Sequence, residues 1–232
     1  MDVVPRQLAL AFERPLSNAW EDFLVGDANR DAVLWLDRWP DWPATALSVY
    51  GPVGCGKTHL MNAFLAQTGG TSLSLNALNN RDLASAVEAQ RVLAVDDADK
   101  LVTVGLAEPL LHLYNSAKEA RCCLLLISIE PPARWNIDLG DLRSRLISCP
   151  TVGIGPPDDT MISAILVKMF ADRQIRVDDA LIDFLVPRME RSYAAAARIV
   201  SLIDETALTT KRRVTLSLAR DVLAHEEPDD DV

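Results

Sequence analysis

Apolar positions follow two alternating spacings between about residue 30 and residue 128. Short continuous apolar runs are typical of buried strands, whereas apolar residues three and four positions apart are typical of one face of a helix. Ala32, Leu36 and Trp39 have the helical spacing and precede the first apolar run. Because strands that alternate with helices favour a parallel sheet covered on both faces, we expect an α/β domain. The sequence predicts strands at 46–50, 72–75, 91–95 and 123–128, with helices at 58–67, 81–90 and 106–120.

The alternation stops at the segment GIGPPDD, residues 153–159. Only helical spacing follows, and the predicted helices cover 158–173, 178–188, 192–208 and 215–226. We therefore expect a small all-helical domain after the α/β domain. The predicted organisation is an N-terminal segment at 1–17, an α/β domain at 18–154, a helical domain at 155–226 and an acidic tail at 227–232.

The N-terminal stretch RQLALAF has apolar residues at every second position. Leu8, Leu10 and Phe12 point to one side of an extended chain, and Gln7 precedes them. This alternation is typical of a first strand of the fold. A tether that docks into a pocket of another protein is the alternative interpretation.

Composition and charge restrict the classes of partner. The 232 residues carry a net charge of −10, which argues against an extended basic surface for phosphate backbones, so we expect little direct DNA binding. The four cysteines form no C-x-x-C pair, and the longest apolar run, residues 122–129, is far shorter than a membrane span. The chain also begins without a basic leader region, and we expect a cytoplasmic protein with no membrane partner.

The strongest chemical signal is GPVGCGKT at residues 51–58, which fits the phosphate-loop pattern between a predicted strand and a predicted helix. Gly51, Gly54 and Gly56 allow backbone N–H groups to turn toward a polyphosphate. Lys57 can reach the outer phosphates, and the Thr58 hydroxyl can bind Mg²⁺. The sequence therefore predicts a site for ADP or ATP with Mg²⁺.

Two aspartates and a serine end the neighbouring predicted strands. Asp96 and Asp97 follow the apolar run at 92–95, at the edge of the sheet where such folds bind ligands. We expect Asp96 to hold Mg²⁺ through water and Asp97 to orient an attacking water, although Asp97 could instead cap the next helix. Ser128 is placed to touch the γ-phosphate or that water, or simply to begin a loop.

At this point the sequence resembles AAA+ ATPases, and within them the DnaA initiator group. The segment FLVGDAN at 23–29 is similar to the part of that group that lies beside adenine, which implies roles for Val25 and Asn29. The phosphate loop matches through His59, and the segments LHLYN at 111–115 and DLRSRL at 141–146 continue the likeness. The resemblance implies an AAA+ P-loop NTPase fold with a parallel sheet between helices, followed by a small all-helical lid.

Within that group, the sequence resembles the Hda family of DnaA-related regulators. DnaA carries a C-terminal helix-turn-helix domain, for which we see no counterpart in this sequence. Members of the Hda family begin with a clamp-binding peptide of the form Q-L-x-L-x-F, and QLALAF matches it. The resemblance implies that Gln7, Leu8, Leu10 and Phe12 bind the DNA polymerase III sliding clamp, and it favours the tether over the first strand.

Two arginines complete the site that the resemblance implies. Arg145 matches the arginine finger that reaches nucleotide on a neighbouring subunit, while Arg143 is expected to be a surface residue. Arg198 is the candidate sensor arginine of the lid, although alignment from Arg191 puts Ile199 at that position.

The resemblance implies a regulator that stimulates hydrolysis of DnaA-bound ATP and has weak ATPase activity of its own. Homo-oligomer formation is compatible with it. The alternative is a self-contained ATPase such as a clamp-loader or helicase-loader subunit.

Overall fold

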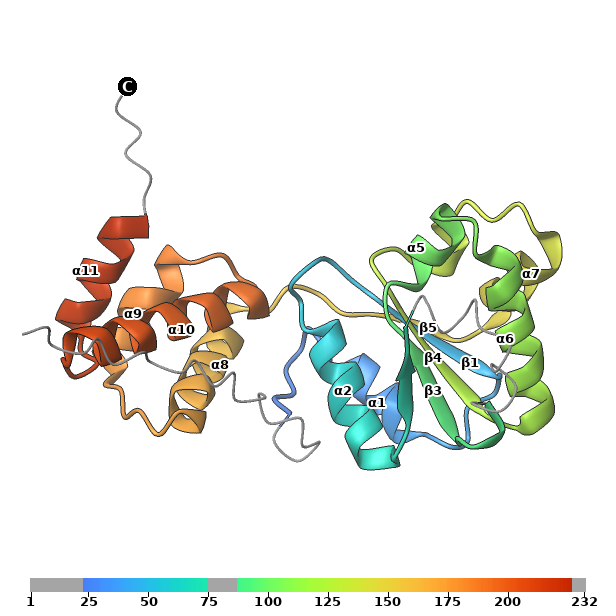
Figure 1. Cartoon of the computed structure of the whole chain (residues 1–232), viewed down its shortest axis with the longest axis horizontal. Helices are drawn as coiled ribbons and strands as arrows, with labels where there is room; N and C mark the ends of the chain where they lie inside the picture. Colours follow the sequence, from blue (N-terminus) through green and yellow to red (C-terminus); the bar gives the residue numbers. More distant parts are fainter. Residues whose placement is uncertain (1–22, 75–86, 227–232) are drawn as a thin grey trace, which may run out of the picture.

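The computed structural model describes residues 23–74 and 87–226, and its first part is a parallel sheet (Figure 1). The sheet has the strand order β2-β3-β4-β1-β5, and all neighbouring strands pair in parallel. The predicted α/β architecture is thus confirmed. The strands are β1 (Ala46–Tyr50), β2 (Thr71–Leu73), β3 (Val92–Val95), β4 (Cys123–Ser128) and β5 (Thr151–Gly153).

Helices cover both faces of this sheet, which explains why its inner strands β3, β4 and β1 are mostly apolar and are buried along almost their whole length. In β4, Leu125 and Ile127 belong to one buried cluster and Leu124 and Leu126 to another, because successive side chains of a strand point to opposite faces. The first cluster contains residues of α1 (Arg30–Asp37) and α2 (Lys57–Thr68). The second contains residues of α5 (Ala98–Thr103), α6 (Ala107–Ala120) and α7 (Gly140–Ser148).

The helical part follows β5 and has a hydrophobic core of its own. Asp158 caps the first of its helices, because its carboxylate accepts a 2.7 Å hydrogen bond from the N–H of Met161. Ser192 caps the helix that begins at Tyr193 in the same way, because its hydroxyl accepts a hydrogen bond from the N–H of Ala195. The elements are α8 (Asp159–Asp172), α9 (Asp179–Leu185), the 3₁₀ turn η3 (Val186–Arg188), α10 (Tyr193–Thr210) and α11 (Leu216–Glu226).

Several predicted boundaries need correction. Helix α1 ends at Asp37, so Trp39 lies outside it. Pro40 follows Trp39, and a proline disfavours helical backbone at the residue before it. Strand β2 ends at Leu73, so Ser74 of the predicted strand lies outside it, while residue 75 and residues 81–86 of the predicted helix 81–90 lie outside the described residues. Strand β5, helices α5 and α7 and the 3₁₀ turn η2 (Pro132–Arg134) were not predicted. Among the described residues, no helix is long and apolar enough to cross a membrane.

Candidate nucleotide-binding site

The phosphate loop lies between β1 and α2, as its sequence predicts. Gly54 and Gly56 have φ values of 77° and 99°, a backbone region that favours glycine. A Cβ atom at Gly51 would lie 2.3 Å from the carbonyl oxygen of Ile154, so the close approach of these two backbone segments requires glycine there. Gly56 is the N-cap of α2 and has no side chain to cover the first N–H groups of the helix. Those N–H groups therefore remain available to an anion.

Lys57 and Thr58 follow the glycines at the start of α2. The ammonium group of Lys57 donates 2.8 Å hydrogen bonds to the carbonyls of Gly51 and Pro52, which holds the cation over the loop. The Thr58 hydroxyl donates a 2.8 Å hydrogen bond to the Asp96 carboxylate, although the two residues are 38 positions apart. The loop and the end of β3 thus bring a hydroxyl and a carboxylate together. These are the hard oxygen ligands that Mg²⁺ prefers, so the donor set fits the expected metal.

Asp97 and Ser128 lie at the same edge of the sheet, but both are engaged locally. Asp97 begins α5 with a φ of 52°, and its carboxylate pairs with Lys100 at 2.8 Å instead of capping the helix. This hydrogen bond raises the pKa of Lys100. Ser128 is 1% exposed, and its hydroxyl donates to the carbonyl of Glu130. The Ser128 carbonyl in turn accepts a 3.2 Å hydrogen bond from Gly51, which joins β4 to the phosphate loop.

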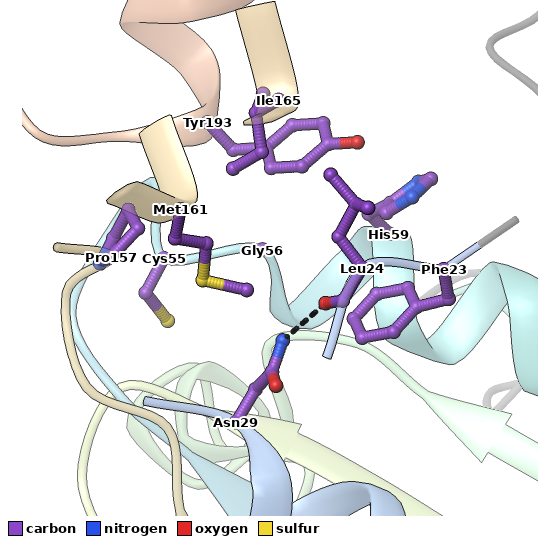
Figure 2. A pocket seen from close by; sticks show the side chains of 10 residues that line it. All are labelled: Phe23, Leu24, Asn29, Cys55, Gly56, His59, Pro157, Met161, Ile165 and Tyr193. Carbon is purple, nitrogen blue, oxygen red and sulfur yellow. Dashed lines mark hydrogen bonds between the residues drawn. The ribbon is translucent and has the colours of Figure 1, made fainter. Parts of the chain in front are cut away.

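A recess with mostly apolar walls lies beside the loop, between the two parts of the chain (Figure 2). Three rings form one wall, because His59 stacks on Phe23 at 5.4 Å and on Tyr193 at 4.8 Å between centroids. Burial lowers the pKa of His59, Lys168 adds to this effect and Asp172 opposes it, so the imidazole favours its neutral form. Burial and Asp172 raise the pKa of Tyr193 to about 12. The recess therefore presents flat, uncharged surfaces of the kind that contact a purine base, but its volume of about 10 Å³ would have to widen to admit one.

Asn29 shapes this recess through the backbone. Its side-chain N–H donates a hydrogen bond to the Leu24 carbonyl, and its side-chain oxygen accepts one from the Gly26 N–H, both 2.9 Å long. Asn29 is only 4% exposed. Both polar ends of Asn29 are thus used to hold the turn, as Figure 2 shows for the bond to Leu24. Val25 is 55% exposed and is not among the lining residues, whereas its neighbours Phe23 and Leu24 are.

The start of α10 contacts the phosphate loop directly. The Tyr193 N–H donates a 2.7 Å hydrogen bond to the Gly54 carbonyl, and a Cβ at Gly54 would lie 2.8 Å from that of Ser192. Arg191, next to these residues, pairs with Asp159 of α8 through two hydrogen bonds of 2.5 and 3.0 Å. Arg191 is thus adjacent to the contact between α10 and the loop. Arg198 is exposed on α10, about 7 Å further along the helix axis than Tyr193.

Arg145 lies on α7 and is held by its own chain. Its guanidinium makes two 2.9 Å hydrogen bonds to Asp141 and a short one to the Asn115 side chain, and it lies over the ring of Tyr114. Arg143 is exposed on the same helix and has no ion pair with any residue of the described part of the chain. The predicted clamp-binding residues Gln7, Leu8, Leu10 and Phe12 lie outside the described residues.

Sequence reasoning missed several residues of this site: Phe23, Pro157, Met161, Ile165 and Tyr193. Phe23 stands in the segment that resembles DnaA, so that likeness could have indicated it. The other four come from the helical part, more than 90 residues after the loop, where no local pattern marks them.

Comparisons with known proteins agree with this geometry. No family model matches the chain. The DnaA chromosomal replication initiator protein of Thermomicrobium roseum is 26% identical over 228 residues, which are 88% of this chain and 49% of that protein. An uncharacterized protein of Haemophilus influenzae is 25% identical over 184 residues, 75% of this chain and 80% of that protein. The chain spans about half the length of the DnaA relatives that it matches.

Solved structures show the same fold. Domain III of Thermotoga maritima DnaA has a TM-score of 0.75 at 20% identity and covers 91% of this chain and 98% of its own. AMPPCP-bound DnaA from Aquifex aeolicus has a TM-score of 0.69 at 19% identity, covering 83% and 66%. The Thermotoga maritima RuvB branch migration motor has a TM-score of 0.70 at 16% identity, covering 93% and 74%. The chain therefore has the AAA+ fold and is related to DnaA.

Proposed function

We propose that this DnaA-related AAA+ protein binds ADP or ATP with Mg²⁺ and regulates the initiation of replication. The observation that carries the proposal is the convergence of Lys57, Thr58 and Asp96 on one phosphate loop beside an uncharged recess. The loop N–H groups and Lys57 would bind the phosphates, and Thr58 and Asp96 would hold Mg²⁺, which supplies positive charge to the phosphate oxygens. Contacts with the wall formed by Phe23, His59 and Tyr193 would orient the base.

The regulatory step would take place on nucleotide held by another protein. Arg145 of this chain would approach the phosphates of ATP bound to DnaA and act as an arginine finger supplied in trans. Its present partners, Asp141 and Asn115, hold the guanidinium at the end of α7 near the chain surface, where its side chain is 29% exposed. Asp97 and Ser128 would position water and the γ-phosphate at the chain's own site. The role in replication rests on the relationship to DnaA.

Docking on the sliding clamp is part of the proposal. Residues 7–12 would insert Leu8, Leu10 and Phe12 into a clamp pocket, and burial of each would contribute about 1.5 to 3 kcal/mol before the cost of ordering the segment. Micromolar affinity follows from such a balance, and the repeated pockets of a ring would raise it by avidity.

The regulatory step is tested by measuring ATP hydrolysis by DnaA in the presence of DNA-loaded clamp, with and without this protein. We expect stimulation by the native chain. Lys57→Ala should lose nucleotide binding in titration calorimetry while Lys118→Ala keeps it, since Lys118 is an exposed residue of α6. Replacing Gln7, Leu8 and Phe12 with Ala should eliminate clamp binding at an unchanged melting temperature.

The pair Arg145→Ala and Arg143→Ala separates the finger from the rest of α7. An arginine finger contributes about 10³- to 10⁵-fold in rate, so Arg145→Ala should nearly abolish stimulation while nucleotide and clamp binding persist. Arg143→Ala should stimulate normally. A stable Arg145→Ala protein with full activity would contradict the mechanism. Joint loss of folding and all activities would instead assign Arg145 to a structural ion pair.

A further inference from the structure

A groove rich in cations lies at the end of α10 farthest from the phosphate loop. The C-terminal end of α10 and the loops before α9 and before α11 enclose about 690 Å³. We call it the basic groove and define it by its four cationic residues, Arg176, Lys211, Arg212 and Arg213, which face one carboxylate, Asp204. This surface is separate from the recess beside the phosphate loop, because the two share no lining residue.

Most of the positive charge in the basic groove is uncompensated. Arg212 pairs with Asp221 at 2.8 Å, and Asp204 is shared with Arg173 at 3.6 Å. Within residues 23–74 and 87–226, the side chains of Arg176, Lys211 and Arg213 have no carboxylate partner and all three residues are exposed. Three such cations in one groove are notable in a chain of net charge −10. They create a local positive potential that attracts an anionic ligand.

The walls of the basic groove point to a peptide. Apolar side chains line it between the cations, namely the half-buried Ile175 and Val214 and the 65% exposed Leu208. A nucleic acid would meet the net charge of −10 over the rest of the surface, which opposes a long polyanion. An acidic peptide with a few apolar atoms matches both the charge and the walls.

The chain itself contains such a peptide. Residues 227–232 read EPDDDV, with four carboxylate side chains, a proline and a valine. They follow α11, whose 11 residues span about 16 Å and begin just after the basic groove. Six residues extend up to about 20 Å, of which about 16 Å would run back along α11, so the last carboxylates of the segment, Asp230 and Asp231, are the ones that can reach the groove. We propose that segment 227–232 docks in the basic groove of its own chain.

The test uses a fluorescent peptide with the sequence of residues 225–232 and two forms of the full chain. The neutral-tail variant carries Glu227→Gln, Asp229→Asn, Asp230→Asn and Asp231→Asn. In the native chain the tether would hold the tail at an effective concentration of about 1 mM. For a peptide Kd near 0.1 mM, fluorescence anisotropy should therefore show about tenfold weaker binding to the native chain than to the neutral-tail variant.

Two further variants, both built on the neutral-tail chain, locate the binding. Lys211→Glu with Arg213→Glu should abolish peptide binding. If this charge reversal prevents folding, the milder Lys211→Gln with Arg213→Gln replaces it and should weaken peptide binding. Lys118→Glu with Arg143→Glu changes the net charge equally on the α/β part and should leave the affinity unchanged. Equal affinity for native and neutral-tail chains would overturn the proposal. So would absence of binding to the neutral-tail chain, or equal loss in the groove and control variants.

Discussion

The contact between Gly54 and Ser192 predicts how replacing one loop glycine with alanine affects stability. Gly54 has a φ of 77°, and an added Cβ would lie 2.8 Å from the Ser192 Cβ. Gly105 has a similar φ of 82°, but a Cβ there would meet no atom within 4 Å. The two glycines thus share the backbone penalty and differ in the steric contact. Gly105→Ala is therefore the matched control for Gly54→Ala.

The backbone penalty for a non-glycine residue in this region is about 1 to 2 kcal/mol, and overpacking adds about 1 to 3 kcal/mol. We expect Gly105→Ala to lower the free energy of unfolding by the first amount and Gly54→Ala by the sum, about 2 to 5 kcal/mol. In a chain of this size 1 kcal/mol corresponds to about 2 to 4 °C in melting temperature. Urea unfolding followed by circular dichroism measures both variants. Equal destabilisation of the two would show that the lid does not press on the loop, and would refute the reasoning.

Three other predictions concern single side chains. Burial lowers the pKa of His59, so below about pH 6.5 the unfolded chain binds a proton that the folded chain does not. The free energy of unfolding should therefore fall on acidification by up to about 1.4 kcal/mol per pH unit. His59→Phe should reduce this pH dependence, as measured by urea unfolding at pH 7.5 and 5.5. The Ser48 hydroxyl is fully buried and has no hydrogen-bond partner among the described residues, so Ser48→Ala should raise the free energy of unfolding by about 1 kcal/mol, and a loss would contradict this account. Asp96→Asn should weaken Mg²⁺-dependent ATP binding about 10- to 100-fold but leave ATP binding in EDTA unchanged; an equal loss in both conditions would remove Asp96 from the metal site.

The longest elements that the sequence predicts are long enough to show a period, although the three-residue β2 was predicted and the nine-residue α7 was not. Strand β4 has six consecutive buried or half-buried residues and α10 has 18 residues, so each displays its pattern several times. Strand β5 has three residues and α5 has six, too few to repeat either spacing. The end of α1 depends on Pro40, a local signal that the apolar spacing of Trp39 concealed.

The candidate site divides in the same way between local and distant information. The phosphate loop is one continuous segment, and Asp96 follows a recognisable strand, so both are predictable from the sequence alone. The recess needs Phe23, Met161 and Tyr193 from three separate segments, and only the packing of the helical part on the loop brings them together. The preference for Leu24 over Val25 depends on the turn that Asn29 holds, which the amino-acid pattern does not specify.

The ion pair between Arg191 and Asp159 has a mechanical consequence. It joins the beginnings of α8 and α10, which also share one hydrophobic core, so these two walls of the recess are expected to move together. Helix α10 is 18 residues, or about 27 Å, long, and its first residue is bonded to the loop. A rotation of about 10° around that bonded end carries the far end through about 5 Å. A rotation of α10 about its hydrogen bond to Gly54 would therefore move Lys211 and Arg213, just beyond the other end of the helix, much farther than the residues at the phosphate loop.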